Sequence, residues 1–136
     1  MREFLRAKIH RARVTRADLE YEGSFGIDSA ILQQVGILPF ESIEIYNVRN
    51  GERLRTYAIE LPAGSGRFES NGAAAHKIKE GDVVIIACYT RLLDAQISTF
   101  RPKILTMDGK TNQVQTFREG RLSYSENEPR SLPLFQ

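Results

Sequence analysis

Gly23 and Ser24, in the stretch "DLEYEGSFGID", could change the covalent structure of their own chain. The pair stands where a strand is expected to end, and a Gly-Ser pair usually marks a turn. A serine hydroxyl can also attack the carbonyl carbon of the preceding residue, and a glycine there leaves room for the strained turn that this attack needs. Loss of a proton from the serine Cα then breaks the chain, and hydrolysis leaves a pyruvoyl group. From spacing alone, the turn remains the better interpretation.

A second stretch, "ERLRTYAI", places a cation, a hydroxyl and a phenol on one expected strand. Alternation along a strand puts Arg53 and Tyr57 on one face and Thr56 on the other. An arginine offers a planar fork to a carboxylate, a tyrosine can donate a proton, and a threonine hydroxyl can polarise a carbonyl. A plain exposed strand explains the same residues, and the pattern by itself favours that explanation.

A third stretch, "SNGAAAH" at residues 70–76, offers backbone N–H groups to a ligand. Asn71 and Gly72 precede three alanines that can open a helix, and such small residues let a ligand approach the backbone closely. A capped helix whose alanine face packs on the core explains the stretch equally well. We interpret His76, and Tyr46 further upstream, as structural.

The segment "FLRAKIHRARVT" alternates as a half-buried strand does. Its two faces are formed by Leu5, Ala7 and Ile9 on one side and by Arg6, Lys8 and His10 on the other. The basic face is either solvated or a source of cations for a dicarboxylate substrate. The apolar positions change phase at Ala12 and Val14, which predicts a bulge or a sharp twist.

The remaining pattern predicts a mostly β fold with short helices at the strand junctions. Asp28 or Ser29 is expected to cap a helix over residues 30–35 that ends at Gly36. Two hairpins are expected, at Asn50-Gly51 and around Asp108-Gly109. Further predictions are a short helix near residues 73–79 and a buried strand over residues 83–89. Few strands, broken by helical turns, favour a partly closed barrel over a sandwich.

Length and composition limit the classes of protein that fit. The 136 residues suffice for one domain, expected over residues 1–120, followed by a polar tail over 121–136 that is loose or depends on a partner. The net charge of +2 is too small to indicate nucleic-acid binding. The one cysteine, Cys88, cannot form an internal disulfide and is interpreted as a buried strand thiol; no metal-binding cluster is expected. No apolar run approaches the roughly 20 residues of a membrane span, and the N-terminus does not read as a signal peptide, so a cytoplasmic protein is expected.

Taken in order, these stretches resemble the family of bacterial aspartate 1-decarboxylases, the pyruvoyl-dependent enzymes that make β-alanine for pantothenate. The resemblance rests on "KIHRARVTRADLEYEGSFGID", "VGILPFESIEIYNVRNGERLRTYAI", "SNGAAAH", "GDVVIIACY" and "RPKI". It implies a double-psi β-barrel that assembles as a homotetramer, with active sites between neighbouring copies. It also makes cleavage of the Gly23-Ser24 bond, which spacing alone does not favour, the preferred interpretation of this pair.

The resemblance also implies a role for each candidate residue. Autocatalytic cleavage would give chains 1–23 and 24–136, with a pyruvoyl group in place of Ser24. L-Aspartate would form a Schiff base with this group and lose its α-carboxylate as CO2, and Tyr57 would protonate the carbon. Thr56 would serve both processing and substrate contact. The remaining substrate-binding residues implied are Gly72, Ala73 and Ala74 through their backbone, Arg53 and Lys8 as cations, and His10 and Asn71 as pocket lining.

Phe25 and Gly26 depart from the residues we expect to be commonest after the serine. Gly26 either gives the loop room for the cleavage geometry, or cleavage is slow or depends on a maturation factor. Two alternatives stay open from sequence. One is a self-processing barrel that acts on another acidic amino acid such as glutamate, and the other is a non-enzymatic small β-barrel that serves as a binding module.

Overall fold

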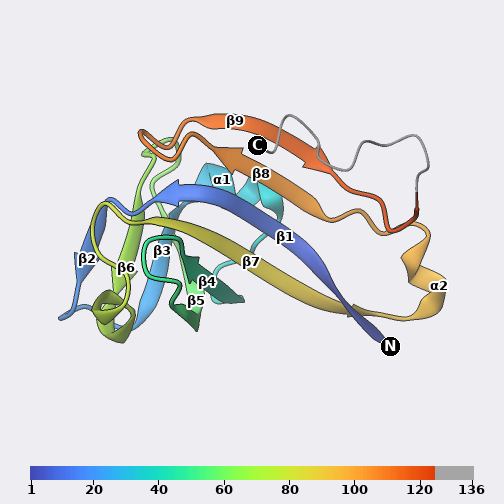
Figure 1. Cartoon of the computed structure of the whole chain (residues 1–136), viewed down its shortest axis with the longest axis horizontal. Helices are drawn as coiled ribbons and strands as arrows, with labels where there is room; N and C mark the ends of the chain where they lie inside the picture. Colours follow the sequence, from blue (N-terminus) through green and yellow to red (C-terminus); the bar gives the residue numbers. More distant parts are fainter. Residues whose placement is uncertain (125–136) are drawn as a thin grey trace.

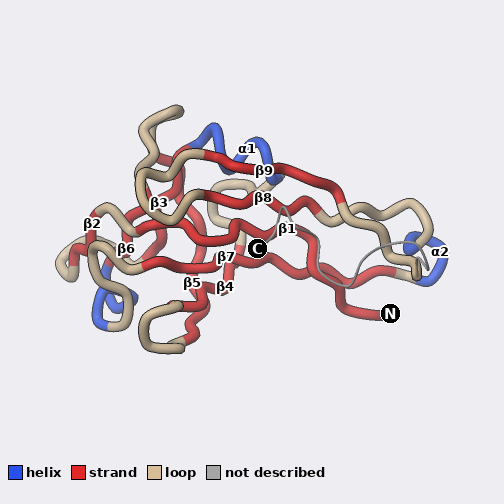
Figure 2. Tube along the Cα trace, turned by 45° about the horizontal axis from the view of Figure 1, so that its top comes forward, coloured by secondary structure: helices blue, strands red, loops and turns tan. Residues whose placement is uncertain are grey.

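The computed structural model describes residues 1–124, so most of the expected tail lies outside the described residues. Strands make up about half of the described chain, and the helical segments lie at its margins (Figure 2). The strands are β1 (Arg2–Arg13), β2 (Arg16–Asp18), β3 (Ser24–Asp28), β4 (Ser42–Asn47), β5 (Arg53–Leu61), β6 (Phe68–Asn71), β7 (Val83–Leu92), β8 (Lys103–Met107) and β9 (Val114–Glu119). The helices are α1 (Ser29–Val35), the 3₁₀ helix η1 (Gly72–His76) and α2 (Asp94–Ile97). The predicted mostly β fold with short helices is confirmed.

The strands form one sheet in the order β2-β6-β3-β5-β4-β7-β1-β8-β9. Three of its pairings are parallel, β1 with β8, β2 with β6 and β3 with β5, although these strands lie far apart in the chain. The long strands β1 and β7 pair antiparallel and span the molecule, with β2, β3 and β6 at one end and α2 at the other (Figure 1). This arrangement is consistent with a barrel, and the double-psi crossing stays a prediction.

From Ala7 onward, strand β1 has the two faces that its alternation predicts, whereas Leu5 stands opposite Tyr89, before a shift in the pairing with β7 between Leu5 and Ala7. Ala7 and Ile9 are fully buried in the core, whereas Lys8 and His10 are half-buried on the opposite face. The predicted bulge is confirmed, because the pairing with β7 shifts between His10 and Ala12 and Arg11 has a φ of 69°. Both predicted hairpins are confirmed as well, between β4 and β5 and between β8 and β9.

Three of the predicted boundaries are wrong. Ser24 begins a strand instead of following the end of one, because "SFGID" is buried throughout and pairs with β5 on one side and β6 on the other. The helix expected near residues 73–79 is the shorter η1, which closes where Lys77 and Ile78 both donate to the Ala74 carbonyl. Strand β7 continues to Leu92, because its pairing with β1 extends to Arg2.

The two residues after the serine have core roles. Phe25 is fully buried, which accounts for a bulky side chain at that position. Gly26 lies inside β3, where an added Cβ would stand 2.8 Å from Cδ1 of Leu61. The expectation that Gly26 loosens the cleavage loop is therefore wrong, since its missing side chain makes room for Leu61 of the neighbouring strand.

Cys88 is the buried strand thiol that the sequence predicts. Its Sγ–H donates to the Ser42 carbonyl at 3.5 Å, and burial raises the pKa of the thiol to about 11. In the part of the chain described, no helix is long and apolar enough to cross a membrane.

Asp28 joins three parts of the fold at the end of β3. Its carboxylate caps α1 by accepting from the Ala30 N–H, and it also accepts from the N–H groups of Gly64 and Gly66. The helix ends at Gly36, in the left-handed conformation that favours glycine. The carboxylate thus holds the 62–67 loop against the strand that begins at Ser24.

Asp28→Ala should lower the free energy of unfolding by about 2–4 kcal/mol, because it leaves three backbone donors without their acceptor and removes a helix cap. Urea unfolding followed by circular dichroism measures this. The control is Glu60→Ala, at an exposed position of β5. Its free energy of unfolding is expected to stay within about 0.5 kcal/mol of that of the original protein. Equal stability of the two variants would contradict the assigned role of Asp28.

Candidate functional site

Ser24 is held in place by hydrogen bonds while the residue before it is open to solvent. The side chain is 2% exposed, and its Oγ donates to the Glu22 carbonyl at 3.2 Å and accepts from Asn71 Nδ2 at 3.1 Å. Asn71 stands opposite Ser24 in the pairing of β3 with β6. Gly23 is exposed, and nothing lies within 4 Å of the place where its Cβ would be. The hydroxyl therefore points back along its own chain, beside the bond expected to be cut.

Gly72 fits closely against this segment. Its φ is +66°, and an added Cβ would stand 2.8 Å from Gly23 Cα and 3.1 Å from the Tyr21 carbonyl oxygen. Atoms this close would have to shift, so only glycine allows η1 to begin where it does. The requirement for glycine at position 72 is thus steric, whereas Gly23 has no positive φ and open space where its own Cβ would be.

A pocket of about 250 Å³ opens beside the exposed glycine. It is lined by three separate segments, which contribute Gly23, Leu54, Arg55, Thr56, Asn71, Ala73, Ala74 and Lys77. Five of the residues predicted from sequence are in this lining, and Ser24 and Gly72 adjoin it. Arg55 and Lys77 are cations that the sequence reasoning missed, although Arg55 lies in the same "ERLRTYAI" stretch. The Lys77 ammonium pairs with Glu52 at 3.2 Å.

Four other predicted residues lie on the opposite face of the sheet, which we call the outer face. Thr56 of β5 pairs with buried Ile43, whereas Arg53 and Tyr57 project to the other side. Successive pairings place one row of side chains across six strands of the outer face, namely Arg53, Tyr46, Ile85, His10, Thr106 and Thr116. Lys8 stands on the same face, two residues from His10. None of Lys8, His10, Arg53 and Tyr57 lines the pocket in the described chain.

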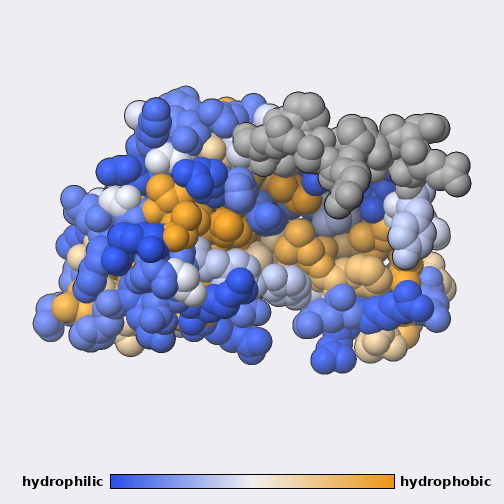
Figure 3. All heavy atoms as spheres, in the orientation of Figure 1, coloured by the Kyte–Doolittle hydropathy of each residue, from blue (hydrophilic) through white to orange (hydrophobic). Residues whose placement is uncertain are grey.

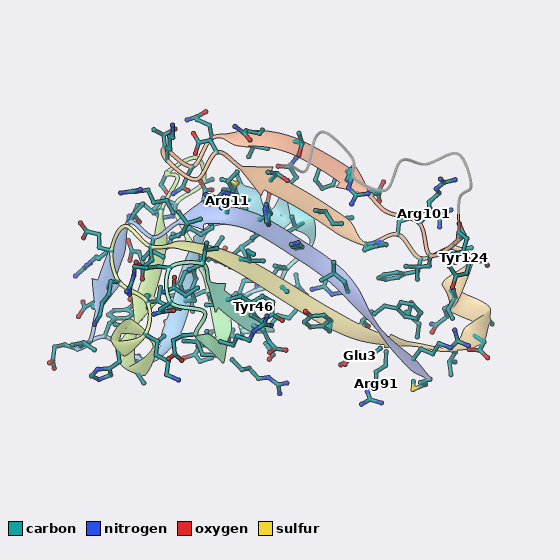
Figure 4. The ribbon with its side chains drawn as sticks, viewed as in Figure 1. Glu3, Arg11, Tyr46, Arg91, Arg101 and Tyr124 are labelled. Atoms are coloured by element: carbon teal, nitrogen blue, oxygen red, sulfur yellow. The ribbon has the colours of Figure 1, made fainter. Side chains whose placement is uncertain are left out.

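Tyr46, which we interpreted as structural, contacts a predicted site residue. The guanidinium of Arg53 lies 4.3 Å from the centre of its ring, a cation–π contact. Its hydroxyl is 2.7 Å from that of Tyr89, and Figure 4 labels Tyr46 below β7. Burial and this hydrogen bond raise the pKa of Tyr46, so the phenol stays protonated. Tyr46 pairs with Arg53 across the predicted β4–β5 hairpin, so the register of that hairpin could have indicated this contact.

His10 is neutral at pH 7 in this environment. Burial lowers the pKa of its imidazole, and the nearby charges of Lys8 and Arg11 lower it further. Its Nδ1 atom is buried and has no hydrogen-bond partner among residues 1–124. Buried polar atoms without a partner are uncommon in folded proteins.

Comparison with known proteins gives one consistent result. A profile of the aspartate decarboxylase family matches residues 1–115. Aspartate 1-decarboxylase from Methylibium petroleiphilum is 50% identical over 118 residues, which cover 87% of this chain and 98% of the relative. The enzymes of the same name from Syntrophobacter fumaroxidans and Alcanivorax borkumensis are each 52% identical, over 79% and 82% of this chain and 87% of each relative.

Gly72→Ala should slow or abolish any cut between Gly23 and Ser24, because the new Cβ displaces the backbone at the bond. Gly51→Ala is the matched control, since Gly51 also has a positive φ but no atom within 4 Å of an added Cβ. Both variants should lose stability from the strained φ, Gly72→Ala more because of the clash, and only Gly72→Ala should lose cleavage. Denaturing mass spectrometry over time measures the cut. Equal cleavage rates would show that the close approach is irrelevant to processing.

Proposed function

The chain belongs to the aspartate decarboxylase family, and from this premise we propose that it converts L-aspartate to β-alanine and carbon dioxide. The observation that carries the proposal is the grouping of Ser24, Asn71 and Gly72 beside one pocket. Ser24 and the Asn71-Gly72 pair come from separate parts of the chain. They supply the attacking hydroxyl, an amide donor to it and a glycine that lets the backbone approach closely. We further propose a cytoplasmic location, as expected from the sequence.

Cleavage would begin with the hydroxyl of Ser24, which is already oriented toward its own N-terminal side. Its Oγ would bond to the Gly23 carbonyl carbon as the C–N bond breaks, giving an ester and a free amine. Loss of the Cα proton of residue 24 would then expel the Gly23 carboxylate. Hydrolysis would release ammonia and leave the keto group. The products would be chains 1–23 and 24–136.

The surroundings of Ser24 fit a pyruvoyl group. Asn71 Nδ2 can donate to a carbonyl oxygen as it now donates to Oγ, and the missing side chain of Gly72 keeps the space open. When present, the pyruvoyl group supplies an electron-accepting carbonyl that takes up the electrons of the broken C–C bond. Thr56 and the backbone of Ala73 and Ala74 would hold the substrate in the adjoining pocket, whose volume of about 250 Å³ suits a small amino acid.

The cations and the proton donor would act from the outer face. Arg53 would bind the side-chain carboxylate of aspartate in a bidentate manner, and Lys8 and neutral His10 would complete the polar surroundings. Tyr57 would give its proton to the carbon that has lost carbon dioxide. A neutral substrate would leave the guanidinium unpaired, at a cost of about 1–3 kcal/mol, which favours acidic amino acids.

Arg53 and Tyr57 do not line the pocket that Arg55 and Thr56 line, so we propose that a second copy of the chain completes each site. The outer face of one copy would meet the pocket of its neighbour, as in the homotetramer that the resemblance implies. The face of the molecule drawn in Figure 3 carries apolar patches among its polar groups. On the outer face, Tyr89 is 41% exposed. Exposed apolar area of this kind is typical of surfaces that contact another protein.

Ser24→Ala should give a folded, uncut and inactive chain, because the attacking hydroxyl is gone. Denaturing mass spectrometry of the unchanged protein should show two fragments that meet at Gly23 and Ser24, the larger bearing the pyruvoyl mass. Carbon dioxide release is then measured with aspartate and with glutamate.

Release of carbon dioxide by Ser24→Ala would contradict the pyruvoyl mechanism. A single mass near 15.4 kDa in the unchanged protein would show that cleavage needs a maturation factor. Faster turnover of glutamate than of aspartate would reassign the substrate.

Tyr57→Phe should allow cleavage of the chain but strongly slow the turnover of aspartate. Co-expression of Tyr57→Phe with Ser24→Ala should restore part of the turnover, because each variant supplies the residue that the other lacks. In mixed assemblies, about a quarter of the sites combine an intact pocket from one variant with Tyr57 from the other. Co-expression of Tyr57→Phe with the double variant Ser24→Ala/Tyr57→Phe is the control and should show no recovery. If mixed assemblies form, as shown by native mass spectrometry, but stay inactive, Tyr57 acts within its own chain.

A further inference from the structure

Phe40 occupies a backbone conformation that its side chain disfavours. Residues 38–41 form a turn in which the Glu41 N–H donates to the Leu38 carbonyl at 3.1 Å. Pro39 is at the second position and Phe40, with a φ of 69°, is at the third. Turns with proline second and a positive φ third favour glycine or asparagine there. A bulky residue at this place is strained.

The surrounding structure holds the turn in this strained form. The Phe40 N–H donates to the Ala58 carbonyl at 2.7 Å, and the Ala58 N–H donates to the Glu41 carbonyl at 3.0 Å. Arg6 forms an ion pair with Glu41 and also donates to the Gly36 carbonyl. The turn is therefore fastened to β5 at the residue that follows Tyr57.

Packing in the core does not explain the phenylalanine. Its side chain is 77% exposed, so a glycine at this position would relieve the strain and sacrifice little burial. The aromatic contact that it does make is with Tyr57, whose ring centre lies 6.0 Å away at an interplanar angle of 30°. This geometry is within the range of favourable aromatic pairs.

We propose that Phe40 is a positioning residue for Tyr57. Its ring covers one side of the phenol and restricts the direction from which the hydroxyl can deliver a proton. In that step the bond to the departing carboxylate breaks, a C–H bond forms with the Tyr57 proton, and solvent restores the proton to the phenol. The inference rests on the proposed function, in which Tyr57 is the proton donor.

Three substitutions separate the ring from the backbone strain. Phe40→Tyr keeps both, Phe40→Leu keeps the strain and removes the ring, and Phe40→Gly removes both. We expect Phe40→Tyr to match the unchanged enzyme. Phe40→Leu and Phe40→Gly should lower kcat by about 10- to 100-fold with little change in KM, since misplacing a reacting group has effects of this size. Phe40→Gly should also raise Tm, which opposes its effect on turnover.

The configuration of the product gives a readout that a structural role would not change. In D2O, each turnover places one deuteron on the carbon that held the carboxylate. A fixed donor delivers it to one side, so the unchanged enzyme should give one configuration of monodeuterated β-alanine. Phe40→Leu and Phe40→Gly should give a mixture.

Unchanged kcat and a single configuration in Phe40→Gly, together with a raised Tm, would overturn the inference. Loss of the assembly in native mass spectra of Phe40→Gly would also overturn it, because Phe40 would then be a contact residue between copies. Failure of the proposed function is distinguishable from both. If the proposed function fails, the unchanged protein will release no carbon dioxide from aspartate, or Tyr57→Phe will show full turnover. Either result would also overturn the inference about Phe40.

Discussion

The close approach of Gly72 to Gly23 is the constraint on which the candidate site depends. Strand β3 is buried along its whole length and is held by β5 and β6, so Ser24 at its start cannot move far. The preceding glycine is exposed, yet the start of η1 lies directly against its backbone. One side of the Gly23-Ser24 bond is therefore fixed by the sheet and the other by a contact that tolerates no side chain. This restraint would favour the proposed attack of the Ser24 hydroxyl on the Gly23 carbonyl carbon.

The alternation of strand β5 divides the remaining chemistry between two faces. Thr56 lines the pocket beside the expected cleavage site, while Arg53 and Tyr57 project from the outer face. Arg55, between them, also lines the pocket, whereas Arg53 and Tyr57 do not. In the proposed function, a second copy would bring its Arg53 and Tyr57 to the pocket. Assembly would then be a condition of catalysis as well as of stability.

Several residues at or near the site depart from the preferences of their local structure. Phe40 has a positive φ and an exposed ring, and His10 has a buried nitrogen without a partner in the described chain. Asp28, by contrast, accepts from three backbone amides. Departures of this kind often occur where function requires them. Phe40 and His10 lie on the outer face or at its margin, near Tyr57 and the cations, whereas the buried Ser70 hydroxyl of β6 also has no partner in the described chain.

The sequence by itself determined the class of fold, both hairpins, the α1 cap and the bulge in β1, because these follow from local periodicity and turn chemistry. It also identified Gly23, Ser24, Thr56 and "SNGAAAH" as candidates, although only the resemblance made them more than a turn, a strand and a helix. Tertiary structure decided that Ser24 begins a buried strand and that Gly26 makes room for Leu61. Each of these depends on pairing between strands distant in the chain. No local pattern records such pairings, because the register between two strands is set only when both are in place.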